Sequence, residues 1–388
     1  MIKLLSLFSG IGAFEKALTN LGVQYEVVNY CEIDKYASKS YSAIHGIPES
    51  KNLWDVTKVN IFNLPKDIDL LTYGFPCQDI SLAGKQKGMF NEDGTLTRSG
   101  LFFKALDVIE CAKPKIAIAE NVKALTSKKF TEEFKIVLDS LEKAGYHNYW
   151  KVLNAKDYGI PQNRERVFIV SIRKDIDHYI FEFPKPYILE KRLKDFLEPY
   201  VDEKYYLSDD LISKIVCWEA HQKPFEKVLG NNSISPTLTA RGAGENHGQV
   251  TATIVNGDIK PKLVGGIGDK KSNGGTQYYQ QDRIYDGESI AMAHPANLTS
   301  GSYYYQVNTQ PLRIRKITPK ECFRLMGFSD EDFSKAEQVP TSNTQLYKQA
   351  GNSIVVNVLE EILKELFINE KKPKRQTDQT RYEQLTLF

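Results

Sequence analysis

The chain has 388 residues, of which 41% are hydrophobic, enough to build one large domain or two. Its formal net charge is only +2, so any nucleic-acid surface must come from local clustering rather than bulk charge. No apolar run is long enough to span a membrane, and the start "MIKLLSLFSGIG" does not read as a signal peptide. The five cysteines are scattered without a CxxC pair, and the six histidines are dispersed. We therefore expect a cytoplasmic protein with reduced thiols, no disulfide framework and no metal site.

The first half of the chain alternates short apolar runs with segments of helical apolar spacing. This regular alternation predicts a parallel sheet that helices cover on both faces. The expected strands are 2–8, 25–32, 68–74, 115–122, 149–155 and 166–172, and the expected helices are 13–22, 33–46, 101–114 and 130–145.

The character of the sequence changes after about residue 186. A linker with a short helix is expected over 183–199, and the Gly-, Asn-, Ser-, Thr- and Tyr-rich stretch 229–311 predicts short strands and long loops. A helix is expected over 318–328, and 345–367 reads as a turn followed by an amphipathic helix. We predict a catalytic domain over 1–187 that is completed by 340–368, a small domain over 188–339, and a flexible polar tail over 369–388.

The turn "LFSGIG" follows the first strand and opens the first helix. Such a turn lets a ligand approach backbone N–H groups at a helix N-terminus, although an ordinary βα turn has the same pattern. Glu32 ends the second strand, where an acidic residue can bind ribose hydroxyls, and Asp55 offers a contact for an adenine amine. Together they predict an adenosine-containing ligand.

Two further residues are expected at the same edge of the sheet. Glu120 ends the strand "KIAIAENV", and Cys77 follows a strand on the turn "YGFPCQDIS". The carboxyl ends of parallel strands are where such sheets bind ligands. The alternatives are a capping or solvated glutamate and a buried cysteine that acts as a small hydrophobic residue.

The segment "PQNRERVF" places Arg164 and Arg166 two residues apart at the start of a strand. They should share one face, with Glu165 on the other. Two guanidinium groups on one face suit the recognition of an anion or a base edge, and the alternative is an exposed, salt-bridged strand end.

Taken together, the ordered motifs resemble the DNA (cytosine-5) methyltransferases, especially those of bacterial restriction–modification systems. The resemblance spans the chain to about residue 366. It is carried by "SLFSGIGAFEKAL", "CEIDKYA", "GFPCQDISLAGKQKG", "ENVKAL", "VLNAKDYGIPQNRERVF", "ITPKECFRLMGF" and "QLYKQAGNSIVVNVL". It implies a Rossmann-like α/β sheet that binds S-adenosylmethionine, with a smaller, loop-rich β domain for target recognition.

The resemblance also assigns a cofactor site, with S-adenosylhomocysteine as the product and no metal. Glu32 would hold the ribose, Asp55 the adenine amine, and the turn at 352–353 would complete the pocket. The implied cofactor-binding residues are Phe8, Gly10, Ile11, Gly12, Glu32, Ile33, Asp55, Val56, Pro76, Leu101, Asn352 and Ser353.

In the same way, the resemblance makes Cys77 the nucleophile that attacks the target cytosine. Glu120, Arg164 and Arg166 would hold that base. The segment 82–100 would be a loop that closes on duplex DNA, and the small domain would read the sequence. Two elements compete for the family's Thr-Leu pair, Thr237–Leu238 and the reversed Leu298–Thr299. The implied DNA contacts are Gln78, Ser81, Lys85, Arg98, Thr237, Leu238, Arg241, Leu298 and Thr299.

The chain ends in "QLTLF", which resembles the pentapeptide by which bacterial replication and repair proteins bind the DNA sliding clamp. Two leucines and a phenylalanine on a polar tether suit an apolar pocket on a partner, and the alternative is a tail that folds back on its own domain. The predicted partner contacts are Gln384, Leu385, Leu387 and Phe388.

Three other functions compete with a DNA methyltransferase. A tRNA cytosine methyltransferase of the same superfamily would lack a long recognition domain, whereas 149 residues separate "RERVF" from "TPKEC" here. A catalytically inactive DNA-binding relative would have lost Cys77, Glu120 or the glycine turn. A nucleotide-binding oxidoreductase would carry a third glycine in that turn. We expect a monomeric DNA-modifying enzyme of a bacterium or phage, associated with the nucleoid.

Overall fold

The computed structural model describes residues 1–76, 89, 97, 99–206, 208, 263–266, 283–286, 291–292, 304–307 and 313–370. For the short strands between 263 and 307 only the backbone is described.

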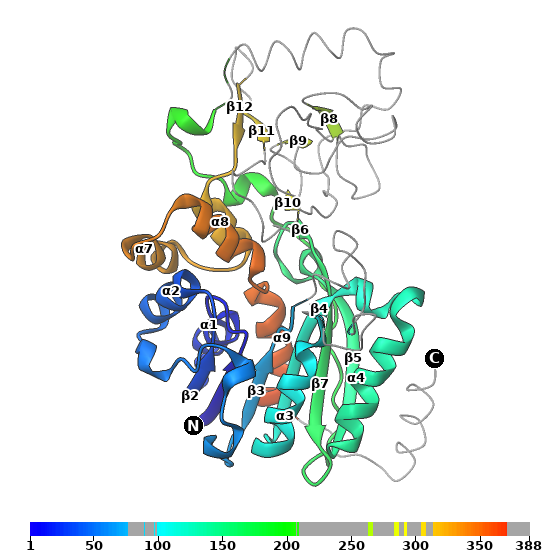
Figure 1. Cartoon of the computed structure of the whole chain (residues 1–388). Coiled ribbons are helices and arrows are strands. Elements are labelled where there is room, and N and C mark those ends of the chain that lie inside the picture. Colours follow the sequence, from blue (N-terminus) through cyan, green and yellow to red (C-terminus); the bar gives the residue numbers. More distant parts are fainter. Residues whose placement is uncertain are drawn as a thin grey trace.

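A six-stranded sheet forms the centre of the larger part, in the order β2-β1-β3-β4-β7-β5 (Figure 1). The neighbours from β2 to β4 are parallel, whereas β7 is antiparallel to both β4 and β5. The prediction of a parallel sheet is therefore wrong for β7. Residues 155–164 join β5 to β7 and are too few for a crossover helix, so the two strands must run in opposite directions. The strands are β1 Ile2–Leu7, β2 Tyr25–Cys31, β3 Leu70–Tyr73, β4 Ile116–Val122, β5 Tyr146–Asn154 and β7 Glu165–Arg173.

Successive residues of each strand pack against opposite layers of helices, as the twofold period of a strand requires. In β1, Leu4 faces one hydrophobic cluster, while Leu5 and Leu7 face the other. The first cluster contains α1 Ala13–Asn20, α2 Lys35–His45 and α9 Val356–Phe367. The second contains α3 Phe102–Ala112 and α4 Thr131–Lys143. The expected helical cover on both faces is confirmed.

The segment that leads into the C-terminal helix differs from its prediction. Residues read as a turn form α8 Asn343–Asn352, because Leu346, Tyr347 and Ala350 are buried in the first core cluster. The helix expected over 318–328 is α6 Pro319–Leu325, and it is followed by the unpredicted α7 Asp330–Gln338. In place of the short helix over 183–199 stands a single 3₁₀ turn, η8 Leu193–Phe196.

A second sheet of four short strands lies above the main sheet in Figure 1, in the order β12-β11-β9-β8. Its strands are β8 Leu263–Gly266, β9 Arg283–Asp286, β11 Tyr304–Val307 and β12 Arg313–Lys316. The two-residue strand β10 Ala291–Met292 pairs with β6 Gln162–Asn163 of the larger part. The smaller β region follows the sequence expectation. The domain boundary at 339/340 stays a prediction, because Ile317 and Phe323 share the first core cluster with α1 and α2.

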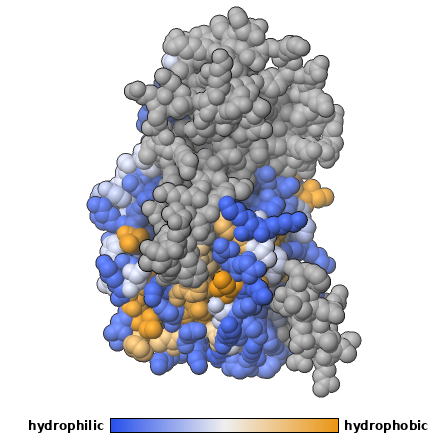
Figure 2. Space-filling model, turned by 45° about the vertical axis from the view of Figure 1, so that its right-hand side comes forward, coloured by the Kyte–Doolittle hydropathy of each residue, from blue (hydrophilic) through white to orange (hydrophobic). Residues whose placement is uncertain are grey.

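On the face that Figure 2 brings forward, hydrophilic residues are widespread over the described surface, with a group of hydrophobic residues in the lower half. Within the described ranges, the structure holds no helix long and apolar enough to cross a membrane.

Candidate active site

Four parallel strands end at one edge of the main sheet and bring the predicted site residues together. Because β2, β1, β3 and β4 are consecutive parallel neighbours, their carboxyl ends meet there. The glycine turn follows β1, Glu32 follows β2, Gly74 follows β3, and Glu120 lies near the end of β4. In a sheet with this strand order, the connections that follow the neighbours β1 and β3 pass to opposite faces of the sheet. Ligands bind in the crevice that this leaves at the carboxyl ends of the two strands.

The glycine turn has an unusual backbone that hydrogen bonds hold in place. Phe8, Gly10 and Gly12 all have positive φ angles, of 54°, 58° and 81°. The N–H of Ser9 donates to Cys31 O at 3.0 Å, and the N–H of Gly12 donates to Ser9 O at 2.9 Å. A Cβ on Gly10 would meet nothing within 4 Å, so open space lies beside the turn.

Glu32 is fixed by backbone donors. Its two carboxylate oxygens accept the N–H groups of Gly10 and Asp34, each at 2.8 Å. The Asn52 side chain accepts the N–H of Glu32 at 3.0 Å and donates to its carbonyl oxygen at 2.9 Å. Desolvation raises the pKa of Glu32, and the two N–H donors oppose that rise. The carboxylate is thus held as an acceptor in one position at the edge of the sheet.

Asp55 lies on the next turn and caps a short 3₁₀ helix. Its carboxylate accepts the backbone N–H of Thr57 at 3.0 Å and the Thr57 hydroxyl at 2.7 Å, which lowers the pKa of Asp55. Two large hydrophobic side chains close to these acids in sequence are exposed: Ile33 at 69% and Trp54 at 43%. Trp54 also has a positive φ of 60°. An exposed apolar pair beside two acids suits a ligand with both a flat ring and hydroxyl groups.

The C-terminal part of the chain returns to this edge. Lys348 on α8 forms an ion pair with Asp34, the N-cap of α2 and the neighbour of Glu32. Beyond it, the predicted cofactor residue Asn352 is exposed, whereas Ser353 is 5% exposed. The ion pair brings α8 to the start of α2, next to Glu32, although Lys348 and Asp34 are 314 positions apart in the sequence.

The residues present fit an adenosine cofactor: an open glycine turn, a fixed carboxylate, and an exposed apolar pair. Two of the predicted contacts face elsewhere. The side chains of Ile11 and Val56 are buried in the two hydrophobic cores, at 1% and 8% exposure, so their contact with a cofactor is limited mainly to the backbone. Pro76 and Leu101 are half-buried.

Glu120 and Arg166 form the second part of the site. Val122 pairs with Arg166 in the ladder, so the Glu120 side chain is a diagonal neighbour on the same face of the sheet. Arg166 Nε lies 3.0 Å from Glu120 Oε1, and the two side chains are 16% and 13% exposed. Desolvation raises the pKa of Glu120, although Arg166 and Arg164 oppose the rise. On the other face, Glu165 pairs with Lys123 at 2.8 Å, as the alternation predicts.

Arg164 has a different position from Arg166. It precedes β7 and is 4% exposed. Its Nη2 donates to the carbonyl oxygens of Gly351 and Ser353, at 3.0 and 2.8 Å. Arg164 therefore links the start of β7 to the turn that the sequence assigns to the cofactor, while its charge still acts on Glu120.

The last described residues before Cys77 lie beside β4. A Cβ on Gly74 would lie 3.7 Å from Glu120 Oε2, and Asn121 Nδ2 donates to Phe75 O at 3.1 Å. Cys77 itself lies outside the described residues, as do the predicted DNA contacts Gln78, Ser81, Lys85, Arg98, Thr237, Leu238, Arg241, Leu298 and Thr299 and the tail residues Gln384, Leu385, Leu387 and Phe388.

Another cysteine near this edge is chemically unsuited to act as a nucleophile. Cys31 ends β2 and is 2% exposed. Burial, with the negative charges of Glu32 and Asp55, raises its pKa to about 12. A thiol in that state is not ionised near neutral pH, so it behaves as a small core residue.

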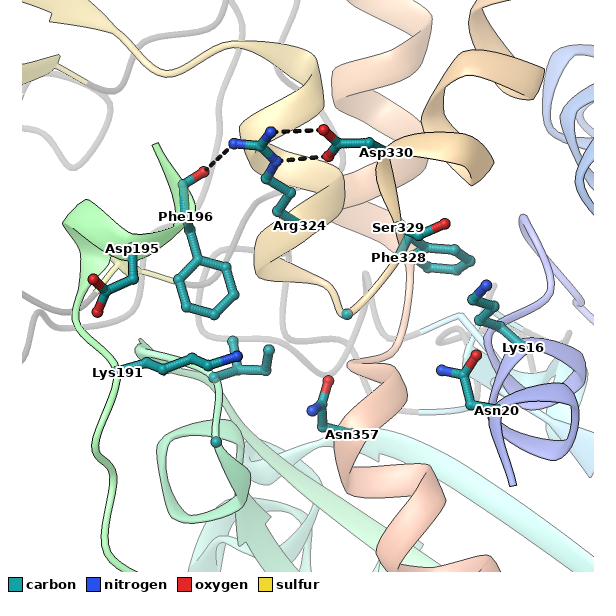
Figure 3. A pocket seen from close by; sticks show the side chains of 13 residues that line it. Lys16, Asn20, Lys191, Asp195, Phe196, Arg324, Phe328, Ser329, Asp330 and Asn357 are labelled. Atoms are coloured by element: carbon teal, nitrogen blue, oxygen red, sulfur yellow. Dashed lines mark hydrogen bonds and ion pairs between the residues drawn. The ribbon is translucent and has the colours of Figure 1, made fainter. Parts of the chain in front are cut away.

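A cavity of about 350 Å³ lies elsewhere, between the C-terminal half of α1, η8 and the start of α7 (Figure 3). Arg324 donates to both carboxylate oxygens of Asp330 at 2.7 Å and also donates to Phe196 O. Lys16 is paired with Asp332 at 2.7 Å. None of the predicted site residues lines this cavity, and its Arg324 and Lys16 are each paired with a carboxylate.

The geometry agrees with the comparison of the sequence with known families. Residues 2–368 match the family described as C-5 cytosine-specific DNA methylase. The chain belongs to this family and is a DNA cytosine-C5 methyltransferase. Enzymes of the family take their methyl group from S-adenosylmethionine and act on double-stranded DNA.

Curated relatives span nearly the whole chain. The orphan methyltransferase M.SPRI of Bacillus phage SPR is 35% identical, and the match covers 94% of this chain and 97% of the relative. The type II methyltransferase M.HhaI of Haemophilus parahaemolyticus is 33% identical and covers 93% of each chain.

Solved structures show the same fold at low identity. The Dnmt2 methyltransferase of S. pombe aligns with a TM-score of 0.59 and 19% identity, over 95% of this chain and 98% of its own. A DNMT2 mutant of Spodoptera frugiperda aligns with a TM-score of 0.60 and 20% identity, over 95% and 100%. These matches support the predicted methyltransferase sheet with a smaller second region.

Proposed function

We propose that this enzyme methylates one cytosine in a specific duplex sequence through a covalent adduct between Cys77 and carbon 6 of the base. The observation that carries the proposal is the pairing of Glu120 with Arg166 at the sheet edge that also holds Glu32. The Glu120 carboxyl group, whose pKa burial raises, and the Glu32 carboxylate then lie at the same edge as the turn that leads toward Cys77. Those are the parts that the reaction needs.

The chemistry begins with the base, because carbon 5 of cytosine is a poor nucleophile. The Cys77 thiolate adds to carbon 6, and the electron pair of the broken 5,6 double bond makes carbon 5 nucleophilic. Glu120 stabilises protonation of the ring nitrogen N3 and so offsets the charge that develops on addition. Arg166 holds the Glu120 carboxyl group in place.

When bound, S-adenosylmethionine would supply an electrophilic methyl group to carbon 5, with its methyl–sulfur bond breaking to leave S-adenosylhomocysteine. A base, which we assign to a water molecule, then removes the proton from carbon 5. The carbon 6–sulfur bond breaks, the 5,6 double bond reforms, and Cys77 leaves as the thiolate. Glu32, which is bound to Gly10 of the open glycine turn, would hold the cofactor ribose. Asp55, whose charge acts on Cys31 at the end of β2, would hold the adenine amine.

A decisive test uses labelled S-adenosylmethionine with duplex DNA that carries 5-fluorocytosine in candidate sites. Fluorine at carbon 5 cannot leave as a proton does, so we expect a covalent adduct with the wild type and none with Cys77→Ser. Cys111→Ser is the matched control, since Cys111 lies on α3 and donates to Ile61 O at 3.1 Å. An absence of adduct and of label transfer to any DNA would refute the proposal, and label transfer to tRNA alone would favour the tRNA enzyme.

Base flipping is part of the same proposal, since neither carbon 5 nor carbon 6 can be reached inside stacked duplex. Flipping costs a few kcal/mol, which contacts to the flanking DNA must offset. We assign those contacts to the loop 82–100 and to the small region. Lys85, Arg98 and Arg241 would contact the DNA phosphates. Bisulfite sequencing of host DNA would identify the target, and a fluorescent base opposite it would report the flip.

We further propose that the C-terminal "QLTLF" recruits the enzyme, as a monomer, to a bacterial sliding clamp on replicating DNA in the nucleoid. An apolar pentapeptide after a basic, polar segment supports this assignment. Deletion of 384–388 should abolish co-purification with the clamp and leave methylation of free duplex unchanged. Replacing Glu383 by Ala is the control in the same segment. Undiminished clamp binding by the deletion variant would overturn the proposal.

A further inference from the structure

The glycine turn is supported by helix α2 as well as by the end of strand β2. Ser9 and Gly10 are tied to the end of β2, through Cys31 O and Glu32 Oε2. The remaining support comes from α2, a helix whose side chains have no predicted part in cofactor binding.

His45, the last residue of α2, contacts the turn directly. Its Nε2 lies 2.9 Å from the carbonyl oxygen of Ile11. A carbonyl oxygen can only accept, so this ring nitrogen carries the proton and donates it. Ile11 lies between two glycines with positive φ, where the direction of each peptide group depends on such contacts.

The fit between α2 and the turn is close enough to exclude a side chain. A Cβ on Gly12 would lie 2.2 Å from His45 Nε2 and 2.9 Å from the ring of Tyr41. The two rings lie against each other, with centroids 5.0 Å apart. Gly12 is therefore required by its neighbours as well as by its backbone angle of +81°.

The contact continues into the first turn of α1. The Tyr41 hydroxyl donates to Glu15 Oε1 at 2.8 Å, and Tyr41 stacks on Tyr30 of β2 at 4.1 Å. One face of α2 thus contacts the chain on both sides of the start of α1. His45 contacts Ile11, which precedes α1, and Tyr41 contacts Glu15, which lies in its first turn.

We propose that His45 is a positioning residue for the cofactor, acting through Ile11. Its Nε2–H orients the Ile11 peptide and so fixes the backbone that surrounds the cofactor. His45 touches neither the cofactor nor the base, and the inference rests on the proposed assignment of the glycine turn to S-adenosylmethionine. Loss of the donor should weaken cofactor binding and leave the chemical step unchanged.

The test compares two side chains of equal length, His45→Gln and His45→Met. Glutamine keeps a nitrogen donor at the distance of Nε2, whereas methionine leaves the Ile11 carbonyl unpaired. We expect methionine to weaken S-adenosylmethionine binding about tenfold, measured by calorimetry, and glutamine to restore it to within about twofold. The value of kcat at saturating cofactor should stay unchanged in both variants. The exposed His178→Gln and His178→Met pair is the control.

Equal losses in the glutamine and methionine variants, or no loss in either, would overturn the proposal. A failure of the wild type to bind S-adenosylmethionine would instead overturn the assignment of the cofactor site. A measurement on the wild type avoids any effect of the substitution on folding. The nitrogen NMR signals of His45 should show the neutral ring with its proton on Nε2, and a ring with Nε2 unprotonated would also refute the proposal.

Discussion

Two carboxylates lie at the same edge of the sheet, and their partners differ. Glu32 accepts two backbone N–H groups, those of Gly10 and Asp34, whereas Glu120 is paired with the guanidinium of Arg166. Desolvation raises the pKa of both groups. The donors to Glu32 are neutral backbone N–H groups, so its hydrogen bonds do not depend on the charge of a partner side chain. The protonation state of Glu120, in contrast, depends on a balance between desolvation and two positive charges.

The difference separates binding from chemistry. A carboxylate fixed by backbone N–H groups is a rigid acceptor, well suited to ribose hydroxyls. A carboxyl group whose raised pKa is set by desolvation against nearby cations can hold a proton for a ring nitrogen. We therefore expect substitutions on the Glu32 side to change cofactor affinity and those on the Glu120 side to change turnover.

The largest expected effect is on turnover, from Glu120→Gln. The amide can still form a hydrogen bond but cannot supply a proton, so kcat should fall about 100- to 10,000-fold. In the wild type the raised pKa keeps the proton to higher pH, and kcat should decline as pH rises through that pKa; the variant should lack this decline. Single-turnover kinetics at several pH values measure both effects. Glu165→Gln, on the opposite face, should behave as the wild type.

Glu32→Gln should produce the next largest effect, in cofactor affinity. One of its oxygens becomes a donor that faces the N–H of Gly10 or of Asp34, so a hydrogen bond is lost at the turn. The dissociation constant for S-adenosylmethionine should rise about 10- to 100-fold with kcat little changed, which calorimetry and steady-state kinetics would show. Glu26→Gln, exposed on β2, the strand that precedes Glu32, is the control. A loss of kcat without a loss of affinity would contradict the separation.

Much of this arrangement can be predicted from the sequence, because periodic patterns are local. The alternation of strands and helices over 2–172 places Glu32 and Glu120 at one edge through topology alone. The direction of β7 also follows from a short connection, once its length is considered. The helix α8 could not be predicted, because Gly351 and the polar residues around it favour a turn, and burial of Leu346 and Tyr347 overrides that preference.

The residues that hold the site in place were missed, and the physical reason is distance along the chain. Asn52 binds the backbone of Glu32 across 20 positions, His45 binds Ile11 across 34, and Asn121 binds Phe75 across 46. Each is a single polar residue, and no local period marks it. A weak signal exists for Asn52, which stands two residues before Trp54 and accepts its N–H as Asn side chains in turns do.

Arg164 connects the two sides, so its substitution should break their independence. Arg164→Lys keeps the charge near Glu120 but loses the planar donor that spans the carbonyl oxygens of Gly351 and Ser353. We expect both the cofactor dissociation constant and kcat to worsen, each about tenfold. Arg166→Lys should lower kcat alone. Equal behaviour of the two variants would show that Arg164 does not couple the cofactor turn to the base pocket.

The smallest expected effect concerns a third carboxylate, Glu15, which lies in the first turn of α1 and is fully buried. Desolvation raises its pKa above the ordinary value of 4.5. The folded state then holds a proton that the unfolded state has lost, so this stability is complete below pH 4.5 and disappears as pH rises through the raised pKa. Glu15→Gln still accepts from Tyr41 but does not titrate.

The free energy of unfolding of Glu15→Gln minus that of the wild type should therefore increase with pH above 4.5. The slope is at most about 1.4 kcal/mol per pH unit for one proton. Urea unfolding at a series of pH values measures this difference, and it cancels the titration of every group that the two proteins share. Glu337→Gln, exposed near the end of α7, is the matched control for the substitution of a glutamate by glutamine. If the difference for Glu15→Gln did not change with pH, Glu15 would be ionised in the folded state as readily as in the unfolded chain. The first turn of α1 would then bury a charged group.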